Sequence, residues 1–155
     1  MKSYLDANFL VRLYLRINAN DDPRRSLRGA DVRAIAPFPV STLCRLEVRN
    51  ALQRMVFESR TGGQGRVTPE GAAAAQGDFD EDLATGALLE PVRLTLEELE
   101  PQFEQLVGRY TAKHGFRTYD LLHVVSAHYL GCDTFWSFDD KALKLAKLEG
   151  LKTNR

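Results

Sequence analysis

Apolar and polar positions follow two distinct patterns along the chain. Behind Asp6, apolar residues recur every three or four positions as far as Ile17, a spacing that predicts an amphipathic helix. Short apolar runs bounded by turn-forming residues predict β-strands, at 3–5, 34–40, 88–94, 133–138 and 151–153. Strands that alternate with helical segments indicate parallel βαβ units with helices on both faces of a sheet. The pattern therefore predicts an α/β fold.

Capping residues mark where the helices begin. A side-chain oxygen just before a helix accepts a hydrogen bond from a backbone N–H two or three residues later, and Thr95 with Glu98 has the spacing of a capping box. The other expected caps are Asn8, Ser41 or Thr42 for a helix running to about residue 60, Thr68 followed by Pro69, and Thr118. Pro101 is expected to kink or restart its helix. Pro37 and Pro39 withhold hydrogen-bond donors from the second strand.

The composition is that of an ordinary globular chain. Of 155 residues, 44% are hydrophobic and 27% are charged, and the length fits a single domain spanning 1–155. Two cysteines, Cys44 and Cys132, are too few for a disulfide framework. No apolar run is long enough to span a membrane, and charged residues stand near the N-terminus where a signal peptide is apolar. We therefore expect a cytoplasmic protein that does not bind membranes.

The net charge of zero conceals an uneven distribution. The first 66 residues carry 12 basic and 6 acidic side chains, the next 44 carry 2 and 10, and the last 45 carry 7 and 5. Within the first segment, Arg24, Arg25 and Arg28 form a basic cluster. These arginines either contact the phosphates of a nucleic acid or belong to a solvated loop, and the neutral total supports neither interpretation.

Four carboxylates stand where the expected elements change or begin. Asp6 ends the first strand, Glu47 lies one turn into the helix after the second strand, Asp120 lies in the first turn of a later helix, and Asp139 follows the fourth strand. The carboxyl ends of parallel strands emerge at one edge of the sheet, where open α/β folds bind ligands. Clustered carboxylates repel one another unless a cation joins them, and oxygen ligands favour Mg²⁺ or Mn²⁺.

Each of these acids also has a purely structural interpretation. Asp6 could form a turn, and Glu47 could face solvent on its helix. Asp120 could stabilise its helix by interacting with the positive end of the helix dipole. Either Asp139 or the adjacent Asp140 could cap the last helix. The joint arrangement favours a shared site, and the spacing Ser-x-Asp favours Asp139 as its fourth acid.

The order and spacing of the acids resemble those of PIN-domain ribonucleases, and among them the small VapC-type toxins of toxin–antitoxin pairs. The matching segments are Tyr4-Leu-Asp-Ala-Asn8, 46–52, 117–127 and Trp136-Ser-Phe-Asp139. The resemblance implies a PIN-like three-layer α/β/α sandwich with a central parallel sheet of about five strands. It also implies metal-dependent endonucleolytic cleavage of RNA with Mg²⁺ or Mn²⁺, a cognate antitoxin, a homodimer and a toxin–antitoxin hetero-oligomer.

The resemblance assigns roles residue by residue. The family's catalytic acids correspond to Asp6, Glu47, Asp120 and Asp139. The three aspartates correspond to metal ligands, and Glu47 is either a further ligand or the residue that orients the attacking water. Asn8 and Ser137 correspond to supporting positions, with Ser137 standing where the family more often has Thr.

Two residues near the acids have open roles. Arg117 either contacts a phosphate of the RNA, as we also consider for the arginines at 24, 25 and 28, or neutralises the acids. His123 lies three residues after Asp120, which makes a metal role feasible. A packed or hydrogen-bonded histidine is the stronger expectation.

Metal-ion catalysis accounts for a site built of acids. A bound divalent ion lowers the pKa of its water and relieves charge on the phosphoryl group. The alternatives are a housekeeping PIN-domain nuclease of RNA processing and a PIN module that binds RNA or protein without cleaving. A phosphoacceptor signalling domain would need an Asp after the third strand, which here ends in Leu94-Thr95-Leu96.

Overall fold

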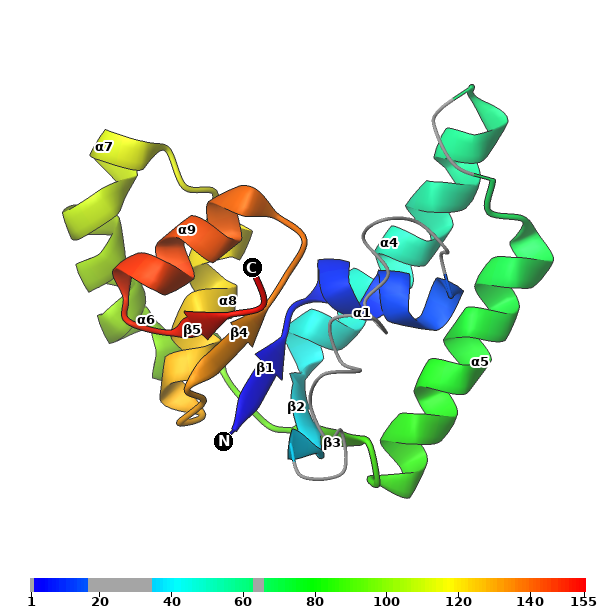
Figure 1. The fold of residues 1–155 in the computed structure, drawn as a ribbon, viewed down its shortest axis with the longest axis horizontal. Coiled ribbons are helices and arrows are strands. Elements are labelled where there is room, and N and C mark those ends of the chain that lie inside the picture. The colour runs from blue at the N-terminus through cyan, green and yellow to red at the C-terminus, as the bar shows by residue number, and fades with distance from the viewer. Residues whose placement is uncertain (1, 17–34, 63–65) are drawn as a thin grey trace.

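Short parallel strands run through the middle of the molecule (Figure 1). The computed structural model describes residues 2–16, 35–62 and 66–155. Its strands are β1 (Ser3–Leu5), β2 (Phe38–Ser41), β3 (Leu89–Val92), β4 (Thr134–Trp136) and β5 (Lys152–Thr153). They pair in the orders β1-β4-β5 and β2-β3, and every pair is parallel. Because β2 lies beside β1, the two ladders together form the centre of the fold.

Helices make up most of the remaining described chain. They are α1 (Ala7–Leu15), α4 (Thr42–Arg60), α5 (Pro69–Thr85), α6 (Leu96–Leu106), α7 (Ala112–His114), α8 (Thr118–Tyr129) and α9 (Asp140–Leu148), with a π-helical segment η1 (Val107–Thr111) after α6. Helix α6 continues through Pro101, where a restart was one predicted outcome. That proline is exposed, so water can reach the carbonyl that it leaves unpaired. None of the described helices combines the length and apolar character needed to cross a membrane.

Successive strand residues point into two different cores. Tyr4 of β1 and Phe135 of β4 pack with residues of α6, α8 and α9, whereas Leu5 and Trp136 pack with α1, α4 and α5. Figure 1 shows these two sets of helices on opposite sides of the strands. Side chains alternate between the two faces of a strand, so a strand of only three residues, such as β1 or β4, contacts the helices on both sides of the sheet. The predicted α/β/α fold class with a parallel sheet is confirmed.

The strands occupy the predicted places; β1 has its predicted bounds, and the other four are shorter than predicted. β2 and β3 have 4 residues each, where the sequence pattern suggested seven. Each contains a proline, Pro39 in β2 and Pro91 in β3, and these lie one register position apart in the shared ladder. Since proline donates no backbone hydrogen bond, this part of the sheet has fewer ladder bonds to extend it.

Most helix starts agree with the predicted caps. Ser41, Thr68 and Thr95 cap α4, α5 and α6, the last with its capping box. The prediction that Asn8 caps α1 is wrong. Asp6 is the cap and accepts a hydrogen bond from Phe9 N, because β1 passes into α1 without an intervening loop. Thr118 is likewise the first residue of α8 and not its cap.

Candidate active site

A cleft of about 730 Å³ opens where β1 and β4 end, between α1, α4, α8 and the start of α9. Its lining includes all four carboxylates singled out in the sequence, Asp6, Glu47, Asp120 and Asp139. Each comes from a different element: the end of β1, α4, the first turn of α8 and the N-cap of α9. The parallel strand order thus gathers acids that are far apart in the chain.

Asp6 is almost completely buried beside the cleft, with 4% of its surface exposed. Oδ1 accepts a hydrogen bond from Phe9 N at 2.8 Å, and Oδ2 accepts one from Ser137 Oγ at 2.5 Å. Burial raises the pKa of Asp6 to about 6, against the lowering effects of His123 and of these hydrogen bonds. A carboxylate in such surroundings is stabilised in its charged form by a nearby cation.

Ser137 connects Asp6 to the start of α9. Its hydroxyl donates to Asp6 and accepts a hydrogen bond from Asp139 N at 2.9 Å. The Asp139 carboxylate in turn caps α9, because Oδ1 accepts from Lys141 N at 2.9 Å and from Ala142 N at 3.2 Å. The backbone N–H groups of the first turn of α9 therefore hold this carboxylate in position.

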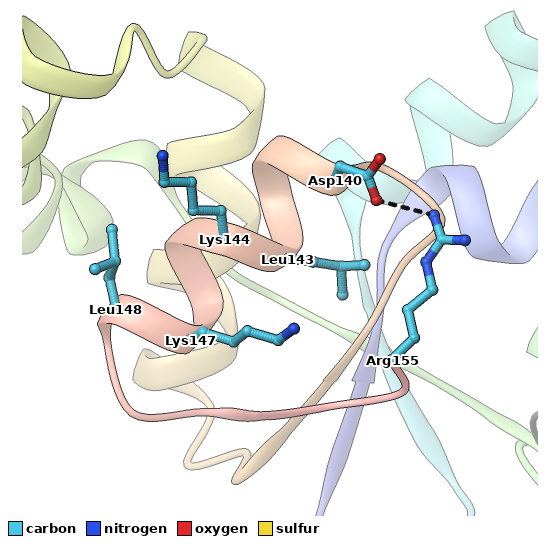
Figure 2. A pocket seen from close by; sticks show the side chains of 6 residues that line it. All are labelled: Asp140, Leu143, Lys144, Lys147, Leu148 and Arg155. Atoms are coloured by element: carbon cyan, nitrogen blue, oxygen red, sulfur yellow. Dashed lines mark hydrogen bonds and ion pairs between the residues drawn. The ribbon is translucent and has the colours of Figure 1, made fainter.

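Asp140, the neighbour of Asp139, lies outside the cleft. Figure 2 shows its carboxylate paired with Arg155, and Asp140 Oδ1 and Arg155 Nη2 lie 3.2 Å apart. The side chain of Asp140 is 93% exposed, compared with 29% for that of Asp139. Of the two adjacent acids, only Asp139 lines the cleft.

Arg117 bridges two of the carboxylates. Its Nη2 lies 2.7 Å from Asp139 Oδ2, and its Nε lies 3.3 Å from Asp120 Oδ2. The backbone N–H of Arg117 also donates to Asp120 Oδ2, at 3.1 Å. The Asp120 side chain is buried while that of Arg117 is 65% exposed. Of the two roles considered for Arg117, neutralisation of the acids is the one present in this structure.

Glu47 is held by a buried histidine. Its Oε2 forms a short hydrogen bond with His123 Nε2, and His123 Nδ1 lies 2.8 Å from the hydroxyl of Tyr4. Burial alone would lower the pKa of His123. The hydrogen bond and charge of Glu47 and the charges of Asp6 and Asp120 raise it. The sequence placed His123 on the helix of Asp120, yet contained no signal for its contact with a glutamate 76 positions away.

Asn8, to which the family resemblance assigned a supporting position, and Tyr119, to which it assigned none, also line the cleft. Asn8 lines the cleft from the first turn of α1, although it does not cap that helix. Tyr119 also lines the cleft and has 56% of its surface exposed. Arg24, Arg25 and Arg28, considered as RNA contacts, lie outside the described residues.

The ligand atoms of the cleft suit a hard divalent cation. The four carboxylates predicted from the sequence offer only oxygen, which Mg²⁺ and Mn²⁺ accept readily. Within residues 2–16, 35–62 and 66–155, no three acidic, histidine or cysteine side chains already form a metal-binding cluster. Instead, Arg117 forms ion pairs with Asp120 and Asp139, and His123 forms a hydrogen bond with Glu47. The residues fit a divalent ion that would compete with Arg117 for its two carboxylates.

Comparison with known proteins identifies the family. The profile of the PIN domain matches residues 3–148. The chain therefore belongs to the PIN domain family, whose members are generally nucleases and usually use divalent metal ions. A comparison with curated proteins gave no match.

Proposed function

We propose that this protein is an endoribonuclease that hydrolyses RNA phosphodiester bonds with Mg²⁺ or Mn²⁺. The observation that carries the proposal is the meeting of four carboxylates, from four separate elements, in one cleft. Membership of a family of nucleases supports hydrolysis of a phosphodiester as the reaction. RNA as the substrate and the metal requirement are our inference.

The acids divide into two roles. Asp6, Asp120 and Asp139 would hold the ion, which when bound lowers the pKa of a water molecule and neutralises charge on the phosphoryl group. Glu47 would be a further ligand or would orient the attacking water. Its Oε2 is bonded to His123, and its Oε1 accepts no hydrogen bond from a described residue. Oε1 is therefore the atom available to accept a hydrogen bond from that water.

Two exposed side chains at the cleft suit a single-stranded RNA. The guanidinium of Arg117 can exchange its carboxylate partners for a phosphate once another cation neutralises those acids, because guanidinium forms charge-assisted hydrogen bonds with both anions. Tyr119 presents a half-exposed ring at the cleft on which a base can stack.

We also propose that the protein is a VapC-type toxin, held inactive in the cytoplasm by an antitoxin. The wall of the cleft that α4 forms includes the apolar side chains of Leu43, Leu46 and Met55 among polar ones, and Leu46 is 59% exposed. An amphipathic antitoxin segment with a basic residue would cover this wall and pair with the carboxylates. A homodimer and a toxin–antitoxin hetero-oligomer are the assemblies that we propose.

An RNA-cleavage assay with and without Mn²⁺ tests the enzyme. We expect cleavage that EDTA stops, and a loss on the order of 100-fold or more in Asp6→Asn and Asp120→Asn, since each removes an electrostatic catalytic group. Asp78→Asn is the matched control, because Asp78 lies on α5 outside the cleft and pairs only loosely with Arg16 at 3.4 Å. A folded wild type that binds RNA without cleaving it would make the protein a binding module. Growth arrest on expression, absent in Asp6→Asn, separates a toxin from a housekeeping nuclease.

A further inference from the structure

A buried tyrosine–histidine pair stands behind Glu47, on the side away from solvent. We infer that Tyr4 and His123 are positioning residues that fix the Glu47 carboxylate in the cleft, an inference that rests on the proposed nuclease function. The three residues come from β1, α8 and α4. They form one hydrogen-bonded chain, from the Tyr4 hydroxyl through the His123 ring to Glu47 Oε2.

The inner end of this chain is rigid. Tyr4 is 1% exposed and stacks on Phe135 of β4, with ring centroids 5.6 Å apart and planes 8° apart. The His123 ring meets the Tyr4 ring edge-on at 5.8 Å and is itself 6% exposed. Neither ring can move without disturbing the core formed by β1, β4 and α8, so the nitrogen that faces Glu47 has a fixed position.

The direction of the hydrogen bond between His123 and Glu47 does not depend on the charge of the histidine. With a neutral ring, the Tyr4 hydroxyl donates to Nδ1, and the proton of His123 is left on Nε2 to donate to Glu47. With a protonated ring, both nitrogens donate, and the Tyr4 oxygen accepts from Nδ1. In both states Nε2 donates to the Glu47 carboxylate, so the pair acts as a constant donor.

The result for Glu47 is that one oxygen is anchored and the other is left for the cleft. The Glu47 side chain lines the cleft from α4 and is 21% exposed, so without an anchor it would sample several rotamers. Hydrogen bonds to a ligating carboxylate orient it, and their loss typically lowers metal affinity or activity 10- to 100-fold. A histidine that merely filled space in the core would have no such effect.

The experiment separates the hydrogen bond from the volume of the ring. His123→Gln keeps a side-chain amide N–H that can reach Glu47, whereas His123→Leu keeps an apolar volume and no donor. We expect Mn²⁺ affinity, measured by calorimetry, to fall about 10- to 100-fold in His123→Leu and to be largely restored in His123→Gln. His128→Leu, on the same helix but outside the cleft, is the control and keeps wild-type affinity. Equal affinities in His123→Leu and wild type, or equal losses in the Gln and Leu variants, would overturn the inference.

A second readout needs neither metal nor activity. The ring nitrogens of His123 are observed by NMR in the metal-free protein, in wild type, Glu47→Gln and Tyr4→Phe. We expect the Nε2 proton to shift in Glu47→Gln and the Nδ1 resonance to shift in Tyr4→Phe. Unchanged His123 resonances in both variants would show that the chain is not formed and would overturn the inference. If the variants show these shifts but the wild type binds no Mn²⁺, the hydrogen-bonded chain is retained. That result would overturn only the nuclease proposal and the positioning role that rests on it.

Discussion

The hydroxyl of Ser137 lies 2.5 Å from the carboxylate of Asp6, so the residue that follows β4 stabilises the residue that follows β1. The strands are parallel neighbours, with Leu5 opposite Trp136 in register, and the next residue along each strand therefore emerges at the same place. Ser137 is completely buried and also accepts a hydrogen bond from Asp139 N. One hydroxyl thus positions two of the four acids.

Removing this hydroxyl should weaken both the fold and the site. We expect Ser137→Ala to lower the free energy of unfolding by about 1–3 kcal/mol, because a buried charged acceptor loses its partner, and to weaken Mn²⁺ binding. Urea denaturation and calorimetry measure the two effects. Ser3→Ala is the control, since the Ser3 hydroxyl is equally buried but has no hydrogen-bond partner among the described residues. Equal stabilities of the two variants would contradict the prediction.

The metal-free protein should become less stable as the pH rises from 4 to 7. Burial raises the pKa of Asp6 to about 6, so the folded state binds its proton more tightly than the unfolded state does. That stability is present below about pH 4 and is lost as the pH passes 6, an effect on the order of 3 kcal/mol. His123, whose pKa is also raised, contributes with the same sign. Urea denaturation across this pH range measures the slope.

Two further measurements belong to the same prediction. Asp6→Asn should flatten the slope, because the amide does not titrate. Mn²⁺ should stabilise the wild type more at pH 7.5 than at pH 5, and the gain at pH 7.5 is about 2.7 kcal/mol at a hundredfold excess over the Kd at that pH. A stability that is independent of pH in wild type, or a gain from Mn²⁺ that is larger at pH 5, would count against the raised pKa of Asp6.

Arg117 should compete with the metal. Arg117→Gln removes the cation between Asp120 and Asp139, so we expect Mn²⁺ affinity to rise about 2- to 10-fold, the scale of partly exposed ion pairs. The metal-free variant should melt at a lower temperature than wild type, since its acids lose their counter-ion. The control is Arg109→Gln, which breaks an ion pair with Glu149 outside the cleft. It should leave both the Mn²⁺ affinity and the melting temperature of the metal-free protein close to those of wild type. A fall in affinity in Arg117→Gln would show that the arginine supports metal binding.

The adjacent acids Asp139 and Asp140 should respond differently to the same change. Asp139→Asn removes a charge from the cleft and is expected to lose Mn²⁺ binding and cleavage. Asp140→Asn alters an exposed carboxylate that pairs with Arg155, and should behave as wild type in both assays. Helical content by circular dichroism verifies that each variant is folded. The reverse result would place Asp140 at the metal.

Local patterns were sufficient to locate the elements but not their extent. The cap at Thr68 and the box of Thr95 with Glu98 depend on residues three positions apart, and the structure has both as predicted. The lengths of β2 and β3 depend on how two segments pair, and the prolines that limit them stand at adjacent register positions on different strands. The cap of α1 is Asp6 and not the predicted Asn8, because β1 leads directly into the helix.

The sequence by itself determined the α/β layering and the gathering of four acids at one sheet edge, because strand periodicity and parallel order are carried by residues close together in the chain. Only the tertiary structure decided which side chains pair with those acids. Arg117 meets Asp139 across 22 positions, and His123 meets Glu47 across 76. Such contacts depend on how α8, α9 and α4 are placed around the strands and on the rotamers that this arrangement allows, and neither is encoded in the spacing of residues along one segment.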